Sequence, residues 1–214
     1  MISLARTIVA SALLLVAVHT SATPIGGIEF PQGAISFADL VVNYLPGSDV
    51  GGTYMTPAEA LGAPDYNDSI EEGAVSLGEG GSLTVAFTDN SLTTSGDSKK
   101  DLWIFEIGSA VESFQVEIST NNENWIDLGF VLGQPTGIDI DAIVGVDFGE
   151  LYSYVRLTDT AGNQSGFPYG EADIDAIGAI SSGQAVPLPV PMSFALFGLG
   201  LILLAVDRSR AYAF

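Results

Sequence analysis

Short apolar segments recur along the middle of the chain and are separated by turns rich in Gly, Pro and Asn. Apolar and polar residues alternate most clearly at residues 82–87 and at Ser113–Ser119. A period of two residues is typical of β-strands that bury one face. The same reasoning predicts further strands at residues 37–44, 74–77, 102–105, 125–131, 138–146, 152–158 and 172–180. Between the two chain ends, no window sustains the 3.6-residue period of an amphipathic helix.

This pattern predicts an all-β fold, an antiparallel, jelly-roll-like β-sandwich of about eight or nine strands. Residues 57–61 are expected to form one short helical turn, and the polar residues 88–100 a solvated loop. The stretch 113–125 comprises an alternating strand, an Asn121-Asn122 turn and Trp125. It resembles the strand-turn-strand unit of discoidin-like, galactose-binding-type domains. That resemblance implies a two-sheet sandwich and leaves the ligand open.

The two chain ends are long apolar segments of a different kind. Residues 1–22 contain Arg6, an apolar core at 8–18 and small residues before a plausible cleavage point after Ala22. This is the pattern of a secretory signal peptide, and the apolar core is short for the alternative, an uncleaved anchor. The other end contains an uncharged apolar run at residues 192–206, which with its lead-in is long enough for a transmembrane helix.

The C-terminal segment has three parts in a fixed order: Val186-Pro187-Leu188-Pro189, the apolar run, and a basic end with Arg208 and Arg210. This order resembles the PEP-CTERM sorting signal in its Val-Pro-Leu-Pro-Ala (VPLPA-CTERM) variant, although Val190 replaces the last Ala. The resemblance implies export through the Sec translocon and then sorting by a membrane-embedded exosortase. It also implies delivery to the cell surface or extracellular matrix of a Gram-negative bacterium. Three parts are therefore predicted: signal peptide 1–22, sandwich 23–185 and sorting segment 186–214.

The predicted body is strongly acidic. Three of the six basic residues lie in the two ends, so residues 23–185 keep three cations against 25 of the 26 acids, a formal charge of −22. Such a surface repels nucleic acid and anionic lipid and attracts divalent cations. The chain has no Cys, and its single His, His19, lies in the predicted signal peptide. These absences exclude from the mature body Ser–His triads, Cys–His pairs and His-ligated zinc.

Acidic residues at predicted strand ends are candidate ligands for a structural Ca²⁺, because hard cations take several carboxylate oxygens at once. The candidates are Asp101, Glu106, Asp159, Glu171, Asp173 and Asp175. Two other interpretations stay open: Asp175 could pair with Arg156, and the remaining acids could be solvated. The loop at residues 63–68 is a weaker metal candidate that resembles the calcium loop of galactose-binding-type domains.

The aromatic loop at Phe167 and Tyr169 precedes the most acidic predicted strand and is a candidate sugar-stacking site. The alternative is a hydrophobic plug that closes the end of the sandwich. Taken together, the sequence predicts an exported, non-catalytic surface or matrix protein that binds Ca²⁺ and glycan, with exopolysaccharide as a partner. Two alternatives remain: a polysaccharide-acting enzyme with paired carboxylates, and a purely structural coat protein.

Overall fold

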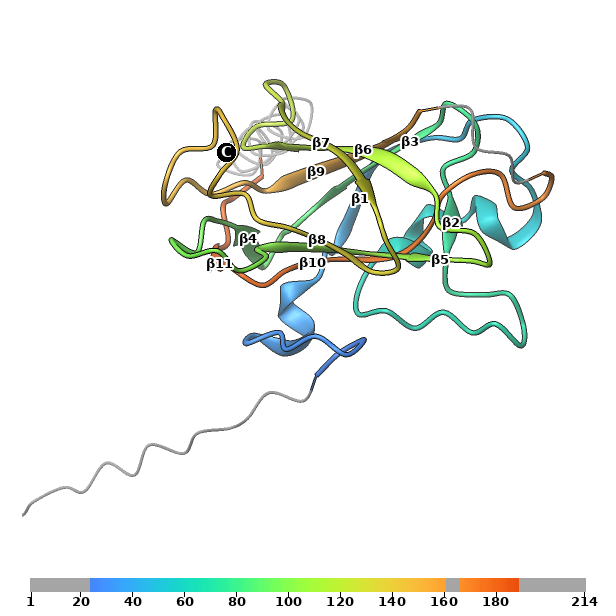
Figure 1. Ribbon diagram of the computed structural model, residues 1–214, viewed down its shortest axis with the longest axis horizontal. Helices are drawn as coiled ribbons and strands as arrows, with labels where there is room; N and C mark the ends of the chain where they lie inside the picture. The colour runs from blue at the N-terminus through green and yellow to red at the C-terminus, as the bar shows by residue number, and fades with distance from the viewer. Residues whose placement is uncertain (1–23, 161–165, 189–214) are drawn as a thin grey trace, which may run out of the picture.

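A computed structural model describes residues 24–160 and 166–188, which fold as an antiparallel β-sandwich (Figure 1). The predicted all-β, two-sheet architecture is thus confirmed. The larger sheet has the strand order β1-β3-β9-β6-β7. Its strands are β1 Leu40–Leu45, β3 Ser82–Ala86, β9 Tyr154–Asp159, β6 Ser113–Ser119 and β7 Ile126–Leu132. The predicted terminal helices, with the signal peptide and the sorting-segment residues Pro189, Arg208 and Arg210, lie outside the described residues.

The smaller sheet has the order β2-β10-β5-β8 and packs face to face with the larger one (Figure 1). Its strands are β2 Val75–Ser76, β10 Asp173–Ala179, β5 Leu102–Ile107 and β8 Thr136–Ile138. The main core lies between the sheets, where alternate residues such as Val116 in β6 and Ile104 in β5 are fully buried. The period of two read from the sequence therefore identified the inward faces correctly.

A second, smaller core covers the outer face of the four-stranded sheet. Phe30 and Phe37 pack on Phe105 and Ala176, and the first two rings are 4.6 Å apart between centroids. Gly178 makes this packing possible, because a Cβ at that position would lie 2.8 Å from Phe30 and 2.9 Å from Phe37. The segment that precedes β1 is thus held against the sheet by aromatic burial.

Residues 88–100 form the predicted solvated loop only in part: 88–89 and 95–100 are exposed, whereas the segment between them contains a buried strand. Strand β4 Asn90–Leu92 is fully buried and pairs with β11 Ser182–Gln184 in a two-stranded ribbon. Two of its polar side-chain groups bond to β11: Asn90 Nδ2 donates to Ser182 Oγ at 2.9 Å, and Ser91 Oγ donates to the Gln184 carbonyl at 2.9 Å. Asn90 Oδ1 is buried without a hydrogen-bond partner. Polar residues can therefore form a buried strand here because side-chain hydrogen bonds offset part of their desolvation.

The helices of the described residues are single 3₁₀ turns, η1 Gly33–Ser36, η2 Gly52–Met55 and η3 Pro57–Ala60. The last of these matches the helical turn predicted at residues 57–61. None of the helices in residues 24–160 and 166–188 is long and apolar enough to span a bilayer.

Candidate functional site

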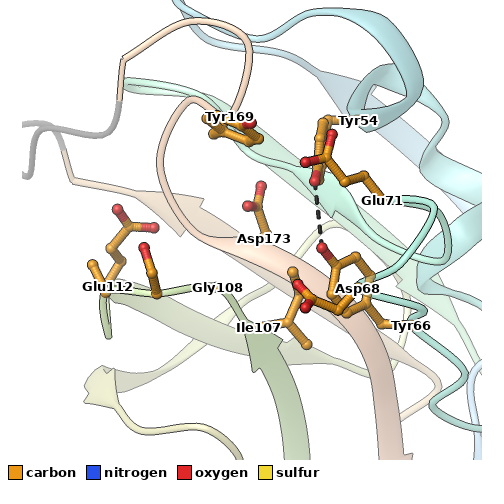
Figure 2. A pocket seen from close by; sticks show the side chains of 11 residues that line it. Tyr54, Tyr66, Asp68, Glu71, Ile107, Gly108, Glu112, Tyr169 and Asp173 are labelled. Carbon is orange, nitrogen blue, oxygen red and sulfur yellow. Dashed lines mark hydrogen bonds between the residues drawn. The ribbon is translucent and has the colours of Figure 1, made fainter.

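A pocket of about 450 Å³ opens at one end of the four-stranded sheet, where β5 ends and β10 begins (Figure 2). Three loops complete it: the long connection between β1 and β2, the β5–β6 turn, and the loop that leads into β10. Its lining consists of Tyr54, Tyr66, Asp68, Glu71, Ile107, Gly108, Ser109, Ala110, Glu112, Tyr169 and Asp173. The walls are therefore tyrosine rings and carboxylates.

The three tyrosines are held by contacts with one another. The rings of Tyr54 and Tyr169 meet edge to face, with centroids 5.4 Å apart and planes at 71°. The hydroxyls of Tyr54 and Tyr66 lie 3.5 Å apart (Figure 2). Desolvation by burial, together with the Tyr66 hydroxyl, raises the pKa of Tyr54 above its usual value. The phenol is therefore protonated at neutral pH and can donate a hydrogen bond into the pocket.

The loop that carries Tyr169 is fixed by backbone pairing with the β1–β2 connection. Tyr169 bridges to Val50, and the Gly51 amide donates to the Pro168 carbonyl at 3.0 Å. Gly170 follows with φ +66°, and a Cβ there would lie 2.5 Å from Ser76 Oγ. Only glycine suits this position, which turns the chain from the loop into β10.

The two residues of the predicted sugar-stacking loop have different surroundings. Tyr169 lines the pocket, and 42% of its surface is exposed. Phe167 is 71% exposed, lies against Gly51 and does not line the pocket. The structure therefore brings Tyr169, and not Phe167, to the candidate site.

Asp173 is a buried carboxylate of the lining and stands between the tyrosines (Figure 2). It is the first residue of β10, where it pairs with Ser76 of β2 and Ile107 of β5. Only 6% of its surface is exposed, and its Oδ1 atom is buried without a hydrogen-bond partner. Desolvation, with Glu112 nearby, raises the pKa of Asp173 to about 8, and the Ser76 hydroxyl offsets part of that effect.

Glu106 lies behind the pocket at the end of β5 and is 2% exposed. Desolvation raises its pKa to about 8; Glu112 and Asp173 add to the effect, and the Gln134 amide opposes it. The hydrogen bonds of Gln134 Nε2 go to the backbone carbonyls of Gly108 and Ala110 and not to Glu106. Both carboxyl oxygens of Glu106 are buried without a hydrogen-bond partner.

Two more of the predicted acids lie toward the same end of the sandwich. Glu171 is 3% exposed, and desolvation, followed by the charge of Asp159, raises its pKa to about 7. Asp159 accepts a hydrogen bond from the Gly80 amide at 2.9 Å. Buried acids at this end therefore repel one another, and proton binding relieves the repulsion.

The last acid of this strand, Asp175, is separate from the pocket. It accepts hydrogen bonds from the amides of Asp65 and Tyr66 at 2.9 and 3.3 Å, so it anchors the loop that was a weaker metal candidate. Desolvation raises its pKa to about 6, although these amides oppose the shift. Arg156, its predicted alternative partner, instead contacts Glu117 at 2.6 Å.

Asp101 lies at the opposite end of β5, in a separate acidic cluster with Asp139 and Asp141. One carboxylate oxygen of each residue lies within 4.8 Å of the others, so these three residues could hold a metal ion. Asp101 is held by the Ser181 hydroxyl at 2.6 Å and the Ile140 amide at 2.9 Å. Asp141 accepts from the Gly96 amide at 2.7 Å, and its Oδ1 is buried without a hydrogen-bond partner.

Within residues 24–160 and 166–188, this is the group of acids close enough to share an ion, so the six predicted ligands do not form one metal site. The structure retains Asp101 and adds two aspartates that the sequence reasoning missed. An Asp-Ile-Asp spacing at residues 139–141 was the available signal. Tyr54 and Glu112 were also missed, because they come from different loops with no local motif. Tyr66 lies in the loop at residues 63–68, which was considered only as a weaker metal candidate.

No known family model matches the sequence, and no curated protein matches it. Among solved structures, the chain is similar to CpGH89 from Clostridium perfringens, in a two-site variant in complex with its substrate GlcNAc-alpha-1,4-galactose. The similarity has a TM-score of 0.36 at 12% identity and covers 73% of this chain and 15% of that chain. This chain thus spans a small part of the length of that enzyme.

Proposed function

We propose that this chain is an exported, non-catalytic protein of the cell surface or extracellular matrix, and that its sandwich binds a glycan in the tyrosine pocket. The observation that carries the proposal is the arrangement of Tyr54 and Tyr169 beside Asp173 in a pocket of about 450 Å³. Aromatic rings stack on the apolar faces of sugars, and carboxylates accept hydrogen bonds from sugar hydroxyls. The volume lies in the usual range for small-ligand sites.

Features of both chain ends support a route to the cell surface. The signal-peptide pattern of residues 1–22 and the Val186-Pro187-Leu188-Pro189 segment with its basic end support export and exosortase sorting. The −22 body charge argues against nucleic acid as a partner. We also propose Ca²⁺ as the ion of the cluster Asp101, Asp139 and Asp141, since its ligands are carboxylates and Ca²⁺ prefers oxygen.

A glycan array, followed by calorimetry on each oligosaccharide that binds, tests the pocket. The variant Tyr169→Ala removes one stacking wall and should weaken binding about tenfold or more, as expected for an aromatic residue at a binding site. The control is Phe130→Ala, which removes a more exposed aromatic ring from β7, outside the pocket. Equal affinity of Tyr169→Ala and the wild type for every bound glycan would contradict this site.

One observation favours a second function, hydrolysis of a polysaccharide. Asp173 lines the pocket with a pKa of about 8, so it is largely protonated at neutral pH, as a general acid must be. Glu112 also lines the pocket and supplies a second carboxyl group. Release of reducing ends from a bound glycan, lost in Asp173→Asn, would replace the binding proposal with this one.

A further inference from the structure

The tyrosine pocket has an excess of negative charge with no cationic side chain among its described residues. Its lining includes Asp68, Glu71, Glu112 and Asp173. The described residues contain three cations, Lys99, Lys100 and Arg156, and none of them lines the pocket. Two of these cations are engaged elsewhere, in the Lys99–Asp97 and Arg156–Glu117 pairs. The field inside the pocket therefore favours a cation and opposes sugars that carry carboxylate or sulfate groups.

The unpaired oxygen of Asp173 also points to a ligand. Its side chain lies in the pocket, it is 94% buried, and Oδ1 has no hydrogen-bond partner (Figure 2). A buried acceptor without a donor costs free energy that a donor on a ligand restores. A cation at this position would also stabilise the ionised form of Asp173, which burial otherwise disfavours. The binding partner of Asp173 should therefore be a charged donor.

The spacing of the carboxylates that line the pocket favours an ammonium over a metal ion as the ligand. Within residues 24–160 and 166–188, the group of three acids whose oxygens lie within 4.8 Å of one another is the Asp101 cluster, which lies outside this pocket. An ion such as Ca²⁺ needs several oxygens gathered around one point. An ammonium has three separate donors and is also attracted to the faces of Tyr rings. Separate carboxylates in a pocket lined by the rings of Tyr54 and Tyr169 therefore suit an ammonium better than a metal ion.

We propose that the pocket recognises a sugar with a free amino group, a glucosamine-type unit of a partly or fully deacetylated polysaccharide. The ammonium donates to Asp173, and the sugar ring stacks on Tyr169. This inference rests on the proposed function, because it names the class of sugar that the same pocket binds. Neutral and N-acetylated units would leave the Asp173 carboxylate without a cationic partner.

Calorimetry on the described domain with three matched tetrasaccharides tests this proposal: a glucosamine oligomer, its N-acetylated form and a glucose oligomer of the same linkage. At about pH 7 most of the sugar amines are charged. The bound ammonium stabilises the ionised carboxylate of Asp173, so the proton that Asp173 holds in the free pocket is released on binding. The glucosamine oligomer should bind at least about tenfold more tightly than the other two, because a charge-assisted hydrogen bond is added. Asp173→Asn should remove that preference, and Glu71→Gln at the exposed rim should reduce it without risk to the fold.

The control variant is Glu123→Gln, which removes an exposed acid from the β6–β7 turn, outside the pocket, and should keep the wild-type preference. Equal affinity for the three oligomers would overturn the amino-sugar assignment and leave the glycan-binding proposal standing. Binding of none of the three, or of ethylammonium as tightly as the glucosamine oligomer, would overturn this inference. If the glycan array were also blank, the proposed function would fail with it.

Discussion

Individual carboxyl groups are the most unusual residues of this protein. Glu106 and Asp173 are nearly inaccessible to solvent, and both oxygens of Glu106 and Oδ1 of Asp173 lack donors from the described chain. Arg156, the single arginine of the body, donates instead to Glu117 and covers the Trp125 ring at 4.1 Å. A buried carboxylate without a cation is costly, so these groups bind protons at pH values where an exposed acid is ionised.

This protonation predicts that stability falls as pH rises. Between about pH 4.5 and 8 the folded state holds protons on Glu106 and Asp173 that the unfolded state has released, and above pH 8 the full charging penalty applies. Each unit of pKa difference is worth about 1.4 kcal/mol. Urea unfolding in chelator should therefore give a smaller free energy of unfolding at pH 9 than at pH 5. The double variant Glu106→Gln, Asp173→Asn should be more stable than wild type at pH 9 by about 1 kcal/mol or more.

The exposed acid Glu123 provides the control for this experiment, because its variant Glu123→Gln should leave the pH profile unchanged. A free energy of unfolding that increases from pH 5 to pH 9 in the wild type would show that cations of the chain, rather than protons, compensate the two buried acids.

At the scale of elements, β5 connects the two acidic regions, since Asp101 precedes it and Glu106 lies near its end. The Asp101 cluster joins three segments: the start of β5, the loop around Gly96 that donates to Asp141, and the chain after β8. An ion there would tie these segments together in the native state only, so it would raise the stability of the whole domain.

We predict that millimolar Ca²⁺ raises the melting temperature of the chelated protein. A concentration of 100 times the dissociation constant stabilises by about 2.7 kcal/mol, which corresponds to roughly 5–10 °C for a domain of this size. Scanning calorimetry with and without Ca²⁺ measures the shift. Asp139→Asn should abolish most of it, whereas Asp173→Asn, in the pocket at the other end of β5, should retain it. An unchanged melting temperature in the wild type would remove Ca²⁺ from this cluster.

The strands that the sequence predicted and those that it missed differ in a physical way. Ser113–Ser119 is long enough to show three buried apolar side chains in alternation, so its pattern was unambiguous. Strand β4 has three residues, two of them polar. It is stabilised by hydrogen bonds from Asn90 Nδ2 and Ser91 Oγ to Ser182 and the Gln184 carbonyl, about 90 residues later. Such partners cannot be read from a local window.

The candidate site shows the same limit. Tyr169 was predicted because an aromatic residue in a Gly/Pro loop beside an acidic strand is a local signal. Tyr54 reaches the pocket only because Gly51 and Val50 pair with the Tyr169 loop, an arrangement between segments more than 100 residues apart. The six predicted metal ligands do not form one site for a related reason. Successive acids along β10 have different surroundings: Asp173 enters the pocket, and Asp175 anchors a loop.

At the scale of the whole molecule, the sandwich is an acidic body between two chain ends with the features of targeting signals. The described structure provides a sufficient hydrophobic core from its two sheets without disulfides, since the chain has no Cys. The core residues stabilise the fold through apolar burial. The sheets consist of strands of the described body and include no residue of either chain end.

We predict that the mature protein lacks both ends. Intact-mass spectrometry of protein recovered from the cell surface should show a chain that begins near residue 23 and has lost the apolar segment after Pro189, because signal peptidase and exosortase remove these parts. The same measurement in a strain without exosortase should show the C-terminal segment retained. Surface protein that still ends at Phe214 in the exosortase-containing strain would contradict the sorting proposal.

The two tryptophans provide one reporter for each layer of the sandwich. Trp103 belongs to β5 of the smaller sheet, and Trp125 immediately precedes β7 of the larger sheet, beneath the Arg156 guanidinium. Their indole emission can therefore be separated by replacing one at a time with Phe. Coincident denaturation curves from the two single-indole proteins would mean that both layers melt as one cooperative unit, and displaced curves would identify the layer that opens first.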